Sequence, residues 1–441
     1  MTLQSIFKFF IAVCASVVLT WFVMHGQSMF FAAGVFLIFL PVFFVRPDVY
    51  FLFFMFVRPV VDLSFRGLQA GNKVSSLMVV PLIGLCVKDL VMNQAHWRRI
   101  REHPLLGKVN ALMGLILCTY FTSFVYTENR MVSMMDFLRF ISIIVSVNYA
   151  VVVFPSEKEG KKRFIKVVLL SSLIPLAMGF WQMATHSGVH ERGYNRILGT
   201  FTHPNVYAEF LALLIFLSFH SFSHAPRHSM ARRLSGLLFI LSIVSFVFTY
   251  TRTLWIAFAA ALVVFAGLKK GSLKKLVYLG LVLLVLGGSF MLVRSRFSDL
   301  NGSQSEGRSS LQWRIDLWRD TVKDLRIHPV LGNGLGMFEY QVGVMAHNDL
   351  IRVAYESGIP SAILFFSLFA LLFFYSVGCL RGAPDSEQDY YRIAAALVAT
   401  LFIAGLAVNT LRSTVIMFYY FCAVIVFLQQ PKRFNENPPR Q

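Results

Sequence analysis

Charged side chains are scarce in this sequence. Asp, Glu, Lys and Arg together make up 14% of its 441 residues, whereas 56% of the residues are hydrophobic. The mean hydropathy of +0.64 excludes a soluble multidomain protein and is typical of a chain that crosses a membrane many times. Because backbone groups in lipid need partners within the chain, the apolar runs that recur as far as residue 428 predict membrane-spanning helices. We therefore expect an all-α polytopic integral membrane protein.

Common signatures of metal, nucleotide and hydrolase chemistry are missing too. The cysteines form no CxxC pair and are expected to be small buried side chains; they are Cys14, Cys86, Cys118, Cys379 and Cys422. The sequence contains no HExxH, GxSxG or GxxxxGK motif. The histidines at 203, 220, 224, 228 and 328 show no metal-ligand spacing with one another. The sequence thus favours metal-free chemistry, and we expect no cofactor.

Fourteen apolar segments are candidate membrane spans, although several are short for a bilayer core of about 30 Å. They lie near residues 6–24, 29–45, 49–61, 75–92, 109–126, 134–154, 164–183, 205–222, 234–250, 254–268, 275–293, 359–379, 393–409 and 414–429. A short segment can be re-entrant or lie at the interface. We therefore expect about 12, and up to 14, transmembrane helices.

Basic residues cluster on alternate connections between these segments. If the N-terminus is cytoplasmic, the clusters HWRRIREHPLLGK, SEKEGKKR, SHAPRHSMARR and KKGSLKK all fall on the cytoplasmic side. This distribution follows the positive-inside rule, so much of the net charge of +19 is an orientation signal. We expect both termini in the cytoplasm, a helix bundle over 1–293, a large outer loop over 294–357, further spans over 358–429 and a tail over 430–441.

The outer loop is expected to contain short helices. The segment SLQWRIDLWRDTVKDL predicts an amphipathic helix that lies over the bundle or along the membrane surface. Its apolar stripe is expected to consist of Leu311, Ile315, Trp318, Val322 and Leu325. HPVLGNGLGMFEY should then turn sharply, with GNGLG as a turn and not a nucleotide loop. HNDLIRVAYES predicts a second short helix that Gly358 ends before the next span.

His347 and several outer arginines are the candidate functional residues. A neutral imidazole at the outer membrane boundary can accept a proton from a sugar hydroxyl, although His347 and Asn348 can equally be helix caps. Guanidinium groups bind phosphate bidentately, so converging arginines can hold a diphosphate without a metal. Arg252 lies at the turn of an apolar hairpin, where a charge is costly; the alternative is that it reaches out to the interface.

Other arginines have simple structural alternatives. Arg196 and Arg314 can form salt bridges within loops. Arg319 is most simply an intrahelical ion pair with Asp316 or Asp320.

Five segments, taken together, carry a resemblance to a known family. They are RILGTFTHPN before a span, TR at an outer hairpin, RIDLW and HPVLGNGLGMFE in one outer loop, and HNDLIRVAYESGIPS leading into a span. In the last segment His347, Asn348, nine further residues and Gly358 form a pattern that resembles the O-antigen ligase family, with Ser361 at its final small position. The resemblance runs from about Arg196 to Ser361. This family shares a superfamily with O-antigen polymerases and protein O-oligosaccharyltransferases.

The resemblance implies a GT-C-like glycosyltransferase of the bacterial inner membrane with a periplasmic active site. It implies inverting transfer of O-antigen glycan from undecaprenyl pyrophosphate to a lipid A–core sugar in lipopolysaccharide biosynthesis. The implied site consists of His347 as catalytic base, Arg196, Arg252 and Arg314 for the pyrophosphate, and Asn348, Arg319 and Arg352 in support.

Three alternatives stay open at this point. An O-antigen polymerase or a protein O-oligosaccharyltransferase would share the histidine and the arginines. A non-enzymatic transporter of lipid-linked glycan would instead carry charges deep in its spans and show symmetry between its halves. The expected partners are the lipid-linked donor, the lipid A–core acceptor and membrane lipid, with no nucleic acid.

Overall fold

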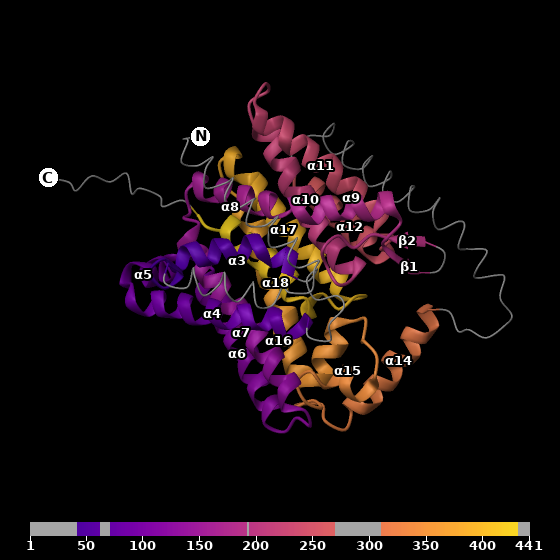
Figure 1. Ribbon diagram of the computed structural model, residues 1–441. Coiled ribbons are helices and arrows are strands. Elements are labelled where there is room, and N and C mark those ends of the chain that lie inside the picture. Colours follow the sequence, from indigo (N-terminus) through magenta and orange to yellow (C-terminus); the bar gives the residue numbers. More distant parts are fainter. Residues whose placement is uncertain (1–41, 62–70, 192–193, 270–309, 431–441) are drawn as a thin grey trace.

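The computed structural model describes residues 42–61, 71–191, 194–269 and 310–430, which form a helical bundle with one small β hairpin (Figure 1). The predicted spans at 6–24 and 275–293, and most of 29–45, lie outside the described residues, as does most of the predicted tail. The mainly helical fold confirms the all-α prediction, and the hairpin is the one departure within the described residues.

Each predicted span in the described part of the chain coincides with a helix. The helices are α3 (Pro47–Val61), α4 (Gly71–Met92), α5 (Gln94–Glu102), α6 (Leu106–Val125), α7 (Arg130–Val153), α8 (Lys158–Ser171), α9 (Leu173–Thr185), α10 (Pro204–His224), α11 (Met230–Phe248), α12 (Arg252–Gly267), α14 (Ser310–Leu325), α15 (Met337–Val342), α16 (Asp349–Cys379), α17 (Asp385–Gly405) and α18 (Thr414–Phe427). A short 3-10 turn, η2 (Thr410–Arg412), precedes α18.

Six of the described helical segments are long and apolar enough to cross a membrane, or seven if the bent pair α4–α5 forms one span. In this count α8 and α9 together make one span of 28 residues. The shorter apolar helices α12 and α18 are not included. The multi-pass architecture is therefore established, while the count of about 12 to 14 stays a prediction.

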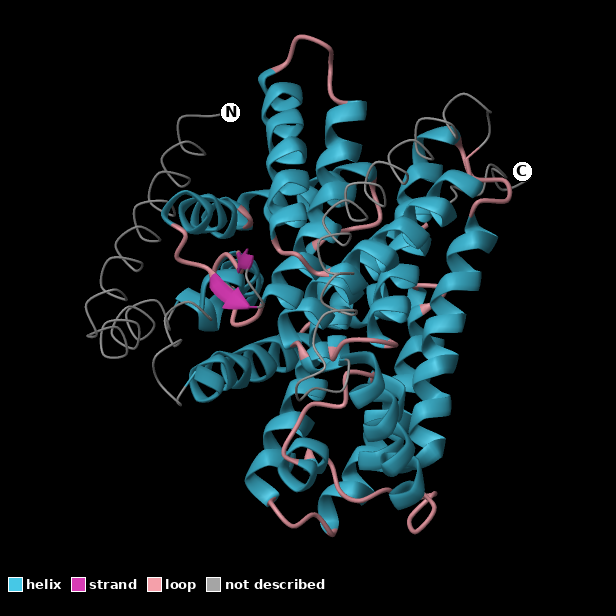
Figure 2. Ribbon diagram, turned by 90° about the vertical axis from the view of Figure 1, so that its right-hand side faces the viewer, coloured by secondary structure: helices cyan, strands magenta, loops and turns pink. Residues whose placement is uncertain are grey.

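The centre of the bundle is α18. Nearly every side chain of this helix is buried, and it packs against α7 and α17. Its sequence, TVIMFYYFCAVIVF, is apolar on all sides, which is the pattern expected of a helix that other helices surround. Figure 1 places α14 and α15 together near the lower end of the molecule, and Figure 2 shows the long helices of the bundle from the side.

The small hairpin lies in the predicted loop between α9 and α10. Strand β1 (Val189–Glu191) pairs antiparallel with β2 (Tyr194–Arg196), so Val189 lies opposite Arg196. The pairing fixes the direction of the backbone at Arg196, which the sequence alone assigned only to an irregular loop.

Gly358 divides α16 into two helical segments. Its φ of 84° and ψ of 163° are not helical, and an added Cβ would lie 1.9 Å from the carbonyl oxygen of Val330. The break confirms the prediction that a short helix ends at Gly358 before the next span. Gly332, Gly334 and Gly336 all have positive φ, which confirms that GNGLG is a turn.

The predicted amphipathic helix is α14, and two residues of its predicted apolar stripe do not pack against the protein. Ile315 and Val322 are 37% and 43% exposed. The face that contacts the protein instead carries Arg314, Trp318 and the buried Thr321. Trp318 donates its indole N–H to the carbonyl oxygen of Ala346 at 2.7 Å, so polar anchors turn the helix away from its apolar periodicity.

Candidate functional site

The site begins where the chain enters α16. His347 has a positive φ of 51°, and its backbone N–H donates to Oδ1 of Asn409 at 3.0 Å. Asn348 is the N-cap, because its Oδ1 accepts from the N–H of Ile351 at 3.1 Å. The Asn348 amide also donates to the carbonyl oxygen of Leu406 at 3.1 Å. The capping alternative therefore holds for Asn348, whereas the His347 side chain does not cap the helix.

The His347 imidazole is neutral and partly buried. Its Nδ1 is enclosed and has no hydrogen-bond partner among the described residues. The Trp313 ring stands nearly perpendicular to it, with centroids 6.1 Å apart. Burial, followed by the charges of Arg314 and His203, lowers the pKa of His347 to about 4. At neutral pH the ring therefore keeps a lone pair that can accept a proton.

The loop formed by residues 406–413 joins the elements around His347. The carbonyl oxygen of Ala407 accepts from a guanidinium NH of Arg314 at 3.2 Å. The backbone N–H of Leu411 donates to Oδ2 of Asp349 at 2.8 Å. Arg412 forms an ion pair with Glu339 on α15. The 406–413 loop thus fixes α14, α15 and the start of α16 relative to one another.

Arg196 sits at a second junction. Its Nε donates to the carbonyl oxygen of Thr249 at 3.0 Å, and one terminal nitrogen lies 3.2 Å from both Asn205 Oδ1 and Thr251 Oγ1. The other terminal nitrogen pairs with Glu191 of the hairpin. These bonds tie β2 to the starts of α10 and α12. Arg252 is the first residue of α12, follows Thr251 directly and has an exposed side chain.

His203 connects these two junctions. It is the N-cap of α10, where its Nδ1 accepts from the N–H of Asn205 at 3.0 Å. Burial and the charge of Arg196 lower the pKa of His203, and His203 acts in turn on His347. Arg196, His203, His347 and Arg314 therefore form a continuous electrostatic group, which we call the His347 group.

Arg352 and Arg319 lie in different surroundings. Arg352 is buried and donates to Glu356 at 3.0 Å and to Asp349 at 3.4 Å. Arg319 is exposed and lies 3.9 Å from Asp316, as expected of an intrahelical pair. Arg352 therefore orders the first segment of α16, and Arg319 faces solvent.

A small cavity of about 30 Å³ opens beside Arg352. Its lining includes Arg139 and Arg412, which the sequence reasoning did not select as site residues. Arg139 pairs with Asp136 at 2.6 Å on α7. The sequence does show two opposite charges, three residues apart, at the beginning of an otherwise apolar run, and this pattern could have identified the pair.

Buried carboxylates were also missed. Glu209 on α10 accepts from the Thr410 hydroxyl, and Asp349 holds both Leu411 and Arg352. Thr410 and Leu411 lie 201 and 62 residues away from these acids along the chain, so the sequence did not show that the 410–411 segment contacts them.

The apolar helices define a multi-pass membrane protein with a histidine and arginines gathered at helix ends. Residues 237–366 match the family model described as O-antigen ligase. This match supports membership of the chain in the O-antigen ligase/polymerase superfamily, and thereby a glycosyltransferase-type role. No curated protein matches the chain.

The matched segment covers α11, α12, α14, α15 and the start of α16. Arg252, Arg314 and His347 lie inside it, whereas Arg196 lies before it. The match supports the expected superfamily and does not separate a ligase from a polymerase.

Proposed function

We propose that the protein transfers a glycan from undecaprenyl pyrophosphate to a sugar hydroxyl of lipid A–core, on the periplasmic side of the bacterial inner membrane. The observation that carries this proposal is the His347 group, in which a neutral, partly buried imidazole lies within the influence of the Arg314 guanidinium and of His203, which is itself under the charge of Arg196. The match to the O-antigen ligase family model supports lipid-linked glycan and lipid A–core as partners.

The reaction is a single displacement at the anomeric carbon of the donor. The acceptor oxygen forms a bond to that carbon, the bond from carbon to the diphosphate oxygen breaks, and His347 takes the hydroxyl proton. Undecaprenyl pyrophosphate leaves with the bonding electron pair. Because attack and departure occur on opposite faces of the sugar, the anomeric configuration is inverted.

The leaving diphosphate is assigned to Arg196, Arg252 and Arg314. Guanidinium groups match phosphate oxygens in geometry and keep their charge at any physiological pH, so they stabilise the negative charge that develops as the bond breaks. This arrangement requires no divalent ion. The charge of Arg314 already acts on His347, which supports placing the diphosphate next to the proton acceptor.

Donor binding should prepare His347 for proton transfer. In the free protein, burial, the charge of Arg314 and the neighbouring His203 hold the pKa of His347 at about 4, so the imidazole is a weak base. A bound diphosphate adds negative charge beside the ring and favours its protonated form. The pKa therefore rises towards neutrality when the donor is in place, where general-base catalysis is most effective. Asn348 and Arg352 serve this step by positioning the start of α16.

The decisive experiment is transfer in reconstituted liposomes that contain purified lipid-linked donor and lipid A–core, in the presence of a chelator. We expect His347→Ala to lower the transfer rate by about 10²- to 10⁴-fold, the usual contribution of a general base. His328→Ala is the matched control, since this histidine is exposed on the same outer segment. Full activity of His347→Ala would reject the base, and strict dependence on divalent cations would reject the arginine assignment.

A polymerase is the second candidate, because the family match covers both activities. In the same assay, transfer onto lipid-linked glycan but not onto lipid A–core identifies the polymerase. Transfer onto a protein acceptor identifies an O-oligosaccharyltransferase, and glycan movement without bond formation identifies a transporter.

A further inference from the structure

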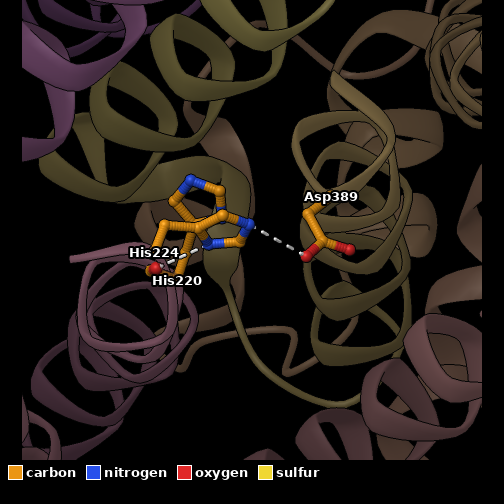
Figure 3. Close-up of side chains that lie close together, drawn as sticks. All are labelled: His220, His224 and Asp389. Atoms are coloured by element: carbon orange, nitrogen blue, oxygen red, sulfur yellow. Dashed lines mark hydrogen bonds and ion pairs between the residues drawn. The ribbon is translucent and has the colours of Figure 1, made fainter. Parts of the chain in front are cut away.

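Two histidines and an aspartate meet at the end of α10 that lies away from His203. Ligand atoms of His220, His224 and Asp389 all lie within 4.8 Å of one another (Figure 3). The histidines were predicted to have no metal-ligand spacing with one another, and for His220 and His224 this prediction is wrong. A separation of four residues places His220 and His224 on one face of α10, and the third ligand comes from α17.

The orientation of His224 suits metal coordination. Its Nδ1 lies 2.9 Å from the carbonyl oxygen of His220, so Nδ1 carries the hydrogen and donates it. The lone pair is therefore on Nε2, which points towards Asp389. Histidine ligands of metals commonly donate their second ring N–H to a backbone carbonyl in this way, which fixes the tautomer and the ring plane.

Asp389 divides its two oxygens between different partners. Oδ1 accepts from Arg392 at 2.7 Å and lies 3.6 Å from the Lys269 ammonium. Oδ2 faces His224 Nε2 at 3.6 Å, which is too long for a hydrogen bond. Two ligands with bonds of about 2.1 Å to one tetrahedral ion are separated by about 3.4 Å. The gap between these atoms is thus close to the one that a bridging ion would need.

His220 supplies a second, independent observation. The residue is only 6% exposed, and its Nδ1 has no hydrogen-bond partner within the described residues. Its ring stacks on that of His224, with centroids 4.2 Å apart. Burying a ring nitrogen without a hydrogen-bond partner costs free energy. A small rotation of the His220 ring would let it coordinate an ion, and this would remove part of that cost.

We propose that His220, His224 and Asp389 bind a zinc ion that joins α10 to α17. Two imidazoles and one carboxylate leave the fourth tetrahedral position for water, and the His224 side chain, 43% exposed, provides access from solvent. The 21 residues of α10 correspond to about 30 Å of helix, so this site is separate from the His347 group. The zinc ion takes no part in the proposed transfer. It stabilises the packing of α10 against α17.

Zinc binding by the purified full-length protein tests this proposal. The protein, in lipid nanodiscs and without a histidine tag, is stripped with a chelator, incubated with Zn²⁺ and freed of excess metal. We expect about one zinc per chain by elemental analysis and a higher unfolding temperature with zinc. His224→Ala and Asp389→Asn should weaken zinc binding at least tenfold and abolish the thermal shift. The expectation follows because each removes one of three protein ligands.

His228→Ala is the matched control, because this exposed histidine lies four residues after His224 and outside the cluster. It should bind zinc as the parent does. A parent protein without stoichiometric zinc, or full binding by His224→Ala, would overturn the site. His224 is exposed enough that its loss should not prevent folding. The transfer assay with chelator is separate, so zinc binding and glycan transfer succeed or fail independently.

Discussion

Each end of α10 carries a histidine, and the charged neighbours of the two histidines have opposite signs. At the first end, His203 lies beside Arg196 and acts on His347, which is also under the charge of Arg314. At the other end, His224 faces the carboxylate of Asp389. Cations around an imidazole keep it neutral and attract an anion, whereas a carboxylate beside an imidazole attracts a cation. The neighbours of each histidine, more than its identity, therefore determine which ligand each end suits.

Arg314→Ala should produce the largest separation between the two ends. Removing a group that stabilises developing negative charge typically lowers the rate by about 10²- to 10³-fold, so glycan transfer should fall by this factor. The acid limb of the remaining activity should move to higher pH. The charge of Arg314 lowers the pKa of His347, so its removal should raise that pKa. The measurement is the transfer rate from pH 3 to pH 8, with zinc content determined on separate samples at neutral pH.

Arg326→Ala serves as the control for this substitution, since Arg326 is exposed just after α14. Unchanged transfer by Arg314→Ala would contradict the catalytic role proposed for the His347 group. Loss of zinc from this variant would show that the two ends are coupled.

Gly358→Ala should disturb the surroundings of His347 through the backbone. A Cβ at this position meets the Val330 carbonyl oxygen at 1.9 Å, and φ of 84° is unfavourable for alanine. The start of α16 must shift, and a displacement of about 1 Å at a reacting group can lower a rate by about 10²-fold. We expect a loss of this size in transfer, a lower unfolding temperature and normal zinc binding.

Gly378→Ala is the matched control in the same helix, because no neighbouring atom lies within 4 Å of the position that an added Cβ would take. It should leave both transfer and zinc binding at the level of the parent. Equal effects of the two substitutions would contradict the role assigned to the break at Gly358.

Asn409→Ala should have a smaller effect, because it removes one hydrogen bond that positions His347. Asn409 Oδ1 accepts the His347 backbone N–H at 3.0 Å. Losing such a bond costs about 1–3 kcal/mol, so we expect kcat to fall about tenfold with KM nearly constant. Asn409→Asp keeps the acceptor and should recover much of kcat. Its added negative charge should raise the pKa of His347 and move the acid limb to higher pH, a change that a purely structural role would not produce.

Hydropathy predicted the helices of the described residues well, because each apolar run must satisfy its own backbone in lipid. It did not show which face of α14 contacts the protein, because that face is held by bonds from Arg314 and Trp318 to backbone carbonyls. The hairpin at Arg196 was also not predicted, because its two strands have only three residues each.

The site was predictable only in part. His347 was selected as a candidate because a histidine at an apolar boundary is unusual, and Arg314 because its segment resembles the O-antigen ligase family; their roles stay predictions. Asn409 was not found, since its bond to His347 spans 62 residues and an asparagine in a loop is ordinary. Asp389 was likewise missed as a partner of the α10 histidines, because it lies on a helix much later in the sequence. Long-range contacts of this kind leave no local pattern.

His203→Asn should have the smallest effect and tests the link between the two junctions. Asparagine is a good N-cap, so the bond to the Asn205 N–H can be kept while the imidazole is removed. At pH 7.5 His347 is already neutral in the parent, and we expect the transfer rate to change by less than about twofold. Because His203 lowers the pKa of His347, its removal should raise that pKa.

The lowered pKa of His347 means that its active, neutral form is lost only as the pH falls towards about 4. In His203→Asn this loss should begin at a higher pH, by less than in Arg314→Ala, because Arg314 has the larger effect on His347. The pH dependence of kcat/KM measures this shift in the free enzyme. An identical acid limb in His203→Asn and the parent would show that His203 has no electrostatic effect on His347. The His347 group would then consist of Arg314 and His347 alone.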